Sequence, residues 1–201
     1  MTGGQPIGSA GPRIVVLSGP SGTGKTTVVK RLIETVAVPI AKAVTATTRR
    51  PRPGETDGRD YHFLSPAEFR KTREEGRFLE TAEVFGTGTW YGTPRSEVER
   101  AQRQGVWCLL EIDVRGALEI KRQFDDAVMI FLQATSIEEY ESRLRQRRTE
   151  TEEAIRSRLD RMREELRFAD RYEFQVVNDD VDRAVAEIGA ILQRREAERN
   201  A

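Results

Sequence analysis

The strongest chemical signal in the chain is a glycine-rich segment that ends in a lysine and two threonines. Gly19-Pro20-Ser21-Gly22-Thr23-Gly24-Lys25-Thr26-Thr27 matches the phosphate-binding pattern G-x-x-x-x-G-K-[ST]. Its glycines let successive backbone N–H groups turn inward around an anion. Lys25 supplies a positive charge for the β- and γ-phosphates, and the Thr26 hydroxyl suits a Mg²⁺ ion. The segment therefore predicts a nucleoside triphosphate site.

A second group of residues has the chemistry of a phosphate monoester site. Residues 45–55 place Arg49 and Arg52 in a segment stiffened by prolines, and the hydroxyls of Tyr61 and Tyr91 follow. A pair of guanidinium groups binds a dianionic phosphate in forked hydrogen bonds. A solvated arginine-rich loop is the alternative that these residues alone leave open.

Alternating strands and helices must position both groups. The phosphate-binding segment follows the apolar run Ile14–Leu17 and opens a helix over Lys25–Val36, which makes an ordinary glycine-rich turn a poor alternative. Further strands are predicted at about 40–45, 106–112, 128–132 and 174–177, and further helices at 96–104, 116–124, 136–145, 151–168 and 181–192. This alternation predicts an α/β fold with a doubly wound parallel sheet.

Two stretches interrupt the alternation. Residues 45–95 combine a Pro/Gly/Arg-rich segment, a helix opened by Ser65-Pro66-Ala67-Glu68 and an alternating strand from Phe78, and predict a mixed α/β insertion. The arginine-dense stretch Arg143–Arg158 joins two helices. Two such units around a phosphate loop predict lobes that close over two substrates.

Composition narrows the class of protein. The 201 residues predict one domain, and 33 basic against 33 acidic residues give no indication of nucleic-acid or membrane binding. The single cysteine, Cys108, excludes an internal disulfide. Without an apolar run long enough to span a membrane or a signal pattern, the expected location is the cytoplasm. Residues 1–12, rich in glycine with two prolines, predict a disordered leader.

An ordered set of motifs resembles the guanylate kinase family. After the phosphate loop come Thr47-Thr48-Arg49-Arg50-Pro51-Arg52-Pro53-Gly54-Glu55, Asp60-Tyr61-His62-Phe63, Phe78-Leu79-Glu80, Tyr91-Gly92-Thr93, Leu110-Glu111-Ile112-Asp113 and Val177-Asn178-Asp179-Asp180. They occur in the family's order, and the resemblance covers about residues 13–195. It implies a P-loop kinase core (about 13–44, 96–135 and 171–195), a GMP-binding insertion (45–95) and a helical lid (136–170), within one domain over 13–201.

The resemblance assigns a GMP site to Thr45, Arg49, Arg52, Tyr61, Glu80, Tyr91, Thr93 and Asp113. Glu80 falls on the guanine-reading position, where a carboxylate accepts hydrogen bonds from N1–H and the 2-amino group. Adenine lacks this donor pair, and such a site discriminates by roughly 10⁴–10⁵. The Thr45 hydroxyl can donate to guanine O6. From the residues alone, Glu80 could equally be an exposed strand residue and Asp113 a capping carboxylate at the end of a strand.

The resemblance also implies the reaction ATP + GMP ⇌ ADP + GDP, with Mg²⁺ held by Thr26, the ATP phosphates and water, and with dGMP as a further acceptor. Arg143, Arg147 and Arg158 match lid arginines, and Asn178 lies in the loop that the family uses near adenine. The expected catalytic residues are Lys25, Arg147 and Arg158. The rest of the ATP site comprises Gly19, Pro20, Ser21, Gly22, Thr23, Gly24, Thr26, Thr27, Arg143 and Asn178.

Two other functions stay open from the sequence. One is a non-catalytic binding module related to guanylate kinase, although such modules typically erode the phosphate loop. The other is a kinase of another small phosphate ester, which Glu80 and Thr45 disfavour. The chain also departs from the usual pattern at four places: Glu111 for Asp, Arg115 for Gln, Arg148 for Gly, and a longer 86–91 segment.

Overall fold

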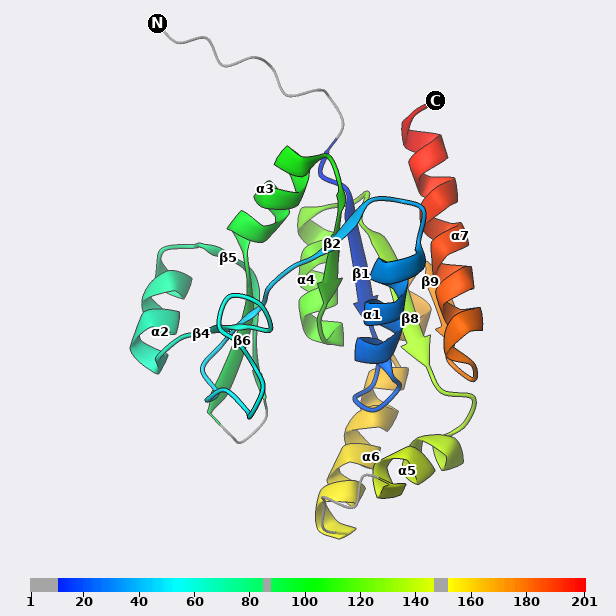
Figure 1. The fold of residues 1–201 in the computed structure, drawn as a ribbon. Coiled ribbons are helices and arrows are strands. Elements are labelled where there is room, and N and C mark those ends of the chain that lie inside the picture. Colours follow the sequence, from blue (N-terminus) through cyan, green and yellow to red (C-terminus); the bar gives the residue numbers. More distant parts are fainter. Residues whose placement is uncertain (1–10, 85–87, 147–151) are drawn as a thin grey trace, which may run out of the picture.

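The computed structural model describes residues 11–84, 88–146 and 152–201. Most of the expected leader (1–12) and part of the longer segment at 86–91 lie outside these residues, as do Arg147 and Arg148. The described chain forms a five-stranded parallel sheet, a smaller mixed sheet and a pair of helices beyond the phosphate loop (Figure 1). The α/β class predicted from the sequence is confirmed.

The core sheet has the strand order β2-β7-β1-β8-β9, and every neighbouring pair is parallel. Its strands are β1 (Ile14–Ser18), β2 (Ile40–Lys42), β7 (Trp107–Glu111), β8 (Val128–Gln133) and β9 (Phe174–Val177). From the central strand β1 the chain crosses first to one side of the sheet and later to the other. In such sheets ligands bind at the carboxyl ends of the strands, beside this reversal.

Alternate residues of each core strand face opposite layers of helices. In β1, Ile14 and Val16 pack toward α3 (Arg95–Gln104) and α4 (Val114–Gln123). Val15 and Leu17 pack toward α1 (Lys25–Thr35) and α7 (Val181–Arg199). Strands buried on both faces are apolar throughout, which explains why they appear in the sequence as short continuous apolar runs.

The second sheet forms the predicted insertion. Its order is β4-β3-β6-β5, with β3 parallel to β4 and the remaining pairs antiparallel. Its elements are β3 (Ala46–Thr47), β4 (His62–Phe63), α2 (Pro66–Glu74), β5 (Phe78–Val84) and β6 (Thr89–Pro94). The expected capping box is present: the Ser65 hydroxyl accepts from Glu68 N–H, and the Glu68 carboxylate accepts from Ser65 N–H.

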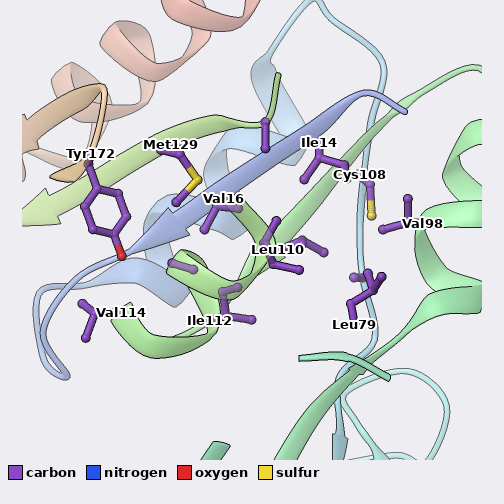
Figure 2. Close-up of a cluster of buried hydrophobic side chains, with 14 of the residues drawn as sticks. Ile14, Val16, Leu79, Val98, Cys108, Leu110, Ile112, Val114, Met129 and Tyr172 are labelled. Carbon is purple, nitrogen blue, oxygen red and sulfur yellow. The ribbon is translucent and has the colours of Figure 1, made fainter. Parts of the chain in front are cut away.

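The apolar core joins the insertion to the parallel sheet. Figure 2 shows Leu79, from β5, in the same cluster as Val98 of α3 and Leu110 of β7. Cys108 also lies in this cluster, where burial raises the pKa of its thiol to about 12. The cysteine is therefore a packed core residue, as its apolar sequence neighbours suggest.

Two boundaries differ from the sequence-based expectation. The strand predicted over 40–45 ends at Lys42, because the chain leaves the core sheet after Ala43, whose N–H still donates to the carbonyl oxygen of Leu109 at 2.9 Å. The last helix, α7, continues to Arg199 instead of ending near residue 192. Glu196 in this extension accepts hydrogen bonds from Arg13 Nε at 3.1 Å and Trp107 Nε1 at 2.8 Å. These contacts attach the last turns of α7 to the core.

The lid region consists of α5 (Ile137–Gln146) and α6 (Glu152–Leu166), followed by the short 3₁₀ helix η1 (Ala169–Arg171). Tyr140 and Leu144 of α5 pack against Ile155, Leu159 and Met162 of α6. The second lid helix thus packs one apolar stripe against the first. Among the described residues no helix is both long and apolar enough to cross a membrane.

Candidate active site

The glycine-rich segment forms a tight loop between β1 and α1. Gly19, Gly22 and Gly24 have positive φ angles of 139°, 100° and 89°. The fit is closest at Gly19, where a methyl group would lie 2.0 Å from the carbonyl oxygen of Leu132. Both the backbone angle and the lack of space therefore require glycine at this position.

Asn178 supports the loop from behind. Its side chain is buried, and Nδ2 donates to the carbonyl oxygen of Thr23 at 2.7 Å. A methyl group at Gly24 would lie only 2.6 Å from the same nitrogen. Asn178 is thus placed against the loop backbone and is not among the residues that line the cavity described below.

Lys25 opens α1 and directs its ammonium group back over the loop. Nζ donates to the carbonyl oxygens of Gly19 at 2.6 Å and Pro20 at 2.9 Å. Burial lowers the pKa of this ammonium, while the nearby carboxylates of Glu111 and Glu165 partly oppose the shift. The cation therefore lies at the phosphate-binding end of β1, where the motif predicts it.

Thr26 belongs to a small polar chain at the ends of three core elements. Its Oγ1 donates to Oε1 of Glu111 at 2.9 Å, and the other carboxylate oxygen accepts from Nζ of Lys42 at 2.7 Å. The sequence marks Glu111 as a departure from the family pattern but gives no indication of Lys42 as its partner. The described residues contain no cluster of three or more His, Cys, Asp or Glu side chains able to hold a metal ion.

A cavity of about 790 Å³ opens at the carboxyl ends of β1, β2 and β7. It is lined by residues of the core, the insertion and the lid. The predicted site residues on its wall are Gly19, Ser21, Lys25, Thr45, Tyr61, Glu80, Tyr91, Asp113 and Arg158. Residues predicted from widely separated motifs therefore share one cavity.

Glu80 is the most deeply buried carboxylate on the cavity wall. It lies on β5 with 6% of its surface exposed, and Oε1 accepts from Oγ1 of Thr93 at 2.6 Å. Burial raises the pKa of Glu80 to about 7, although the Thr93 hydrogen bond opposes the shift. The alternative of an exposed strand residue is excluded. Thr93 orients the carboxylate and does not cap α3, which has no side-chain cap.

Asp113 is both a capping residue and a residue of the cavity wall, the two interpretations that the sequence left open. Its Oδ1 accepts from the backbone N–H of Gly116 at 2.8 Å, so it caps the first turn of α4. The same residue also lines the cavity. The cap fixes the carboxylate at the end of β7, on the side of the cavity where Glu80 lies.

Arg49 is held by a carboxylate and two aromatic residues of the insertion. Its Nη1 and Nη2 donate to the two oxygens of Glu55 at 2.6 and 2.7 Å, and Nε donates to the Tyr91 hydroxyl at 3.3 Å. The guanidinium carbon lies 4.9 Å from the centre of the Tyr61 ring. Arg49 and Tyr91 therefore meet as predicted. Arg52 has an exposed side chain, and neither arginine is among the residues lining the cavity.

The lid contributes Arg158 to the cavity from α6. Arg143 lies in α5, whereas Arg147 falls outside the described residues. Tyr140 of α5 donates its hydroxyl to the carbonyl oxygen of Ser21, which ties this helix to the phosphate loop. The sequence gives this buried tyrosine only as part of a helical pattern.

Several charged residues of the cavity were not predicted as site residues. The basic ones are Lys42, Arg115, Arg161, Arg167 and Arg171, and the acidic ones include Glu164 and Glu165. Arg161 lies three residues after Arg158 and so shares its helix face, a spacing that could have identified it. The others are brought to the cavity by the fold, and no local motif marks them.

Comparisons with known proteins show which family the whole chain resembles. The family model described as guanylate kinase matches residues 11–195. The chain is 46% identical over 184 residues to a guanylate kinase from Rhodopirellula baltica, covering 90% of this chain and 87% of the relative. It is 51% identical over 176 residues to one from Salinibacter ruber, covering 87% and 92% of the two chains.

A solved structure extends the likeness to three dimensions. The crystal structure of guanylate kinase from Anaplasma phagocytophilum superposes with a TM-score of 0.72 at 32% sequence identity. The match covers 94% of this chain and 87% of that one. Sequence and fold thus resemble the same family along nearly the whole chain.

Proposed function

The chain belongs to the guanylate kinase family, and we propose that the residues around the cavity carry out the family's reaction in the roles described below. The protein is a nucleoside monophosphate kinase that transfers the γ-phosphoryl group of ATP to GMP. The products are ADP and GDP. dGMP as a further acceptor and a cytoplasmic location remain predictions from the sequence.

Glu80 reads the guanine base. Its ionised carboxylate accepts hydrogen bonds from N1–H and the 2-amino group, and the Thr45 hydroxyl on the same cavity donates to O6. Thr93 holds Oε1 of Glu80 in place at 2.6 Å. Adenine would leave this buried carboxylate without its donors, and an unsatisfied charged group is costly. Asp113 supports the guanosine side of the same wall.

The acceptor phosphate is bound by the insertion. Tyr61 and Tyr91 both lie on the cavity wall. Arg49 donates a hydrogen bond to the Tyr91 hydroxyl, and its guanidinium group lies over the Tyr61 ring. Glu55 holds the Arg49 guanidinium in two parallel hydrogen bonds, which fixes its plane. Arg52 joins this group from its exposed position when the phosphate binds. The GMP phosphate is largely dianionic at neutral pH, so the transfer needs no general base.

The donor phosphates are bound by the loop and the lid. Inward-facing N–H groups of residues 19–26 and the Lys25 ammonium hold the ATP phosphates. Arg158 and Arg147, with Arg143, supply positive charge as the phosphoryl group moves between oxygens. Asn178 acts indirectly here, because it supports the loop through Thr23. Closing of the lid excludes water that would otherwise accept the phosphoryl group.

Thr26 and Glu111 fit a magnesium ion. A hydroxyl and a carboxylate oxygen lie 2.9 Å apart beside the phosphate loop, and Mg²⁺ favours such oxygen ligands together with substrate phosphates and water. When bound, the ion neutralises charge on the ATP phosphates. Lys42 pairs with the second oxygen of Glu111 at 2.7 Å and so holds this carboxylate in one orientation.

The observation that carries the proposed function is the placement of Glu80 and Lys25 on one cavity. An ADP-release assay with Mg-ATP and GMP, AMP, CMP or UMP tests it. We expect turnover with GMP only, and a KM for GMP raised at least tenfold in Glu80→Gln. Glu99→Gln, an exposed glutamate of α3, is the matched control and should behave as the wild type. Equal turnover of AMP and GMP, or none with any nucleotide, would refute the assignment.

A further inference from the structure

The guanine-reading carboxylate lies directly against a glycine of another element. Gly116 is the third residue of α4, whereas Glu80 belongs to β5 of the insertion. A methyl group at Gly116 would lie 2.7 Å from Oε2 of Glu80 and 3.0 Å from its Cδ. Carbon and oxygen atoms do not approach so closely, so any side chain at residue 116 would force Glu80 to move.

Glu80 has little freedom to move. Its side chain is buried, and Oε1 is held by the Thr93 hydroxyl at 2.6 Å. The two carboxylate oxygens therefore have different neighbours: Oε1 is bonded to Thr93, and Oε2 lies over Gly116. Displacing Oε2 would leave at most one carboxylate oxygen in its original position.

The backbone gives no reason for glycine at this position. Gly116 is helical and is not among the glycines with positive φ angles. Within a helix, alanine is favoured over glycine by about 1 kcal/mol. A glycine at a helical position that favours alanine indicates that something other than helix propensity determines the residue there. Here the determining requirement is space for Glu80.

We propose that Gly116 is a specificity-determining residue, which makes room for the second oxygen of the guanine-reading carboxylate. The inference rests on the role proposed above for Glu80. Guanine presents two donors, N1–H and the 2-amino group, and a correctly placed carboxylate accepts from both. IMP has N1–H but lacks the 2-amino group. Gly116 therefore supports the discrimination of GMP from IMP as well as the affinity for GMP.

The test is Gly116→Ala with Gly189→Ala as its matched control. Gly189 lies within α7, and a methyl group there would be 3.6 Å from Cγ2 of Val36, an ordinary contact. Both substitutions exchange a helical glycine for alanine. We measure KM and kcat for GMP, IMP and ATP, together with the melting temperature of each variant.

For Gly116→Ala we expect the KM for GMP to rise roughly tenfold to a hundredfold, the effect of losing one hydrogen bond to a charged group. The preference for GMP over IMP, as a ratio of kcat/KM values, should fall with it. The KM for ATP should not rise above that of Gly189→Ala, and the melting temperature should not fall below that of Gly189→Ala. Gly189→Ala itself should keep wild-type nucleotide constants.

Three results would overturn the inference. A wild-type KM for GMP in Gly116→Ala, with GMP binding lost in Glu80→Gln, would refute the role of Gly116 and leave that of Glu80 intact. A wild-type KM for GMP in Glu80→Gln would refute the role of Glu80, and the inference with it. A parallel loss of ATP binding and melting temperature in Gly116→Ala would assign the glycine to folding.

Discussion

Burial controls the ionisation of Glu80. With 6% of its surface exposed, the carboxylate has a pKa raised from 4.5 to about 7. The Thr93 hydroxyl favours the ionised form, while the charge of Asp113 works against it. A protonated carboxyl group cannot accept hydrogen bonds from guanine on both oxygens. In the role proposed for Glu80, GMP binding has to remove this proton near neutral pH.

The first prediction concerns the pH dependence of GMP binding. The KM for GMP should fall as the pH rises through about 7, because Glu80 becomes ionised. The phosphate of GMP titrates separately, near pH 6. Glu80→Gln has no titrating group at this position, so its KM should show only the phosphate transition. A transition near pH 7 that persists in Glu80→Gln would contradict the assignment.

The second prediction concerns stability. A carboxyl group with a raised pKa in the fold stabilises the fold below its unfolded pKa of about 4.5, and this contribution is lost as the pH rises through about 7. Glu80→Gln removes the buried charge, so its melting temperature at pH 8 should exceed that of the wild type. Each kcal/mol gained in the free energy of unfolding corresponds to about 2–4 °C. The difference should shrink toward pH 5. A lower melting temperature for the variant at pH 8 would contradict this account.

At the scale of elements, one buried side chain holds the point where the chain enters the insertion. Residues 43–45 lead from β2 to β3, and Oε2 of Glu97 on α3 accepts from Val44 N–H at 2.9 Å. The same oxygen accepts from Nη2 of Arg100 at 2.7 Å, and that nitrogen also donates to the carbonyl oxygen of Lys42 at 3.2 Å. Glu97 therefore positions the segment that carries Thr45.

The third prediction follows from this contact. Glu97→Ala removes the acceptor that Val44 N–H and Arg100 share, and should raise the KM for GMP roughly fivefold to tenfold through Thr45. The KM for ATP should stay near the wild-type value, since the phosphate loop lies on other elements. Glu97→Gln keeps one acceptor oxygen and should restore much of the loss.

Glu99 supplies the control for that prediction. It lies on the same helix, is exposed, and contacts Arg103 at 4.0 Å. Glu99→Ala should leave both nucleotide constants unchanged. Equal increases in the KM values for ATP and GMP in Glu97→Ala would indicate general destabilisation and not a role in placing Thr45.

Sequence patterns predicted the elements better than the contacts between them. The apolar runs from Ile14 and Val128 are β1 and β8, because strands buried on both faces need such runs. The strand expected at 40–45 is too long by three residues, since its local pattern does not reveal where the chain changes sheets. The pairing of Lys42 also escapes a local pattern, because its partner Glu111 lies on β7, far along the sequence.

The site residues likewise divide into those that local motifs predict and those that only the folded chain identifies. The loop glycines and Lys25 follow from one local motif. Glu80 was singled out through the family resemblance, whereas without that resemblance only its burial in the folded chain distinguishes it from Glu83. Gly116 carries no local signal, because its neighbour Glu80 comes from the insertion. Asn178 is predicted from the family resemblance to lie near adenine, and its contact with the loop through Thr23 carries no local signal in the sequence. Such roles depend on how the insertion and the core pack together.

At the scale of the whole molecule, the cavity gathers charged residues from distant parts of the sequence, although the chain is neutral overall. Glu80 and Asp113 are on the wall assigned to guanine, and Lys25 lies at the loop assigned to phosphate. Arg158 and Arg161 add positive charge from the lid. Core, insertion and lid (Figure 1) each line part of one cavity, so the proposed roles depend on all three units together.

The most direct test of phosphoryl transfer is to follow the γ-phosphoryl group itself. The full chain is incubated with Mg²⁺, GMP and ATP labelled with ³²P at the γ-position, and the products are separated by chromatography. We predict that the label appears in GDP in proportion to the ADP formed, and that omitting GMP abolishes the transfer. Label released as inorganic phosphate, or label retained in ATP while GMP is present, would contradict the account.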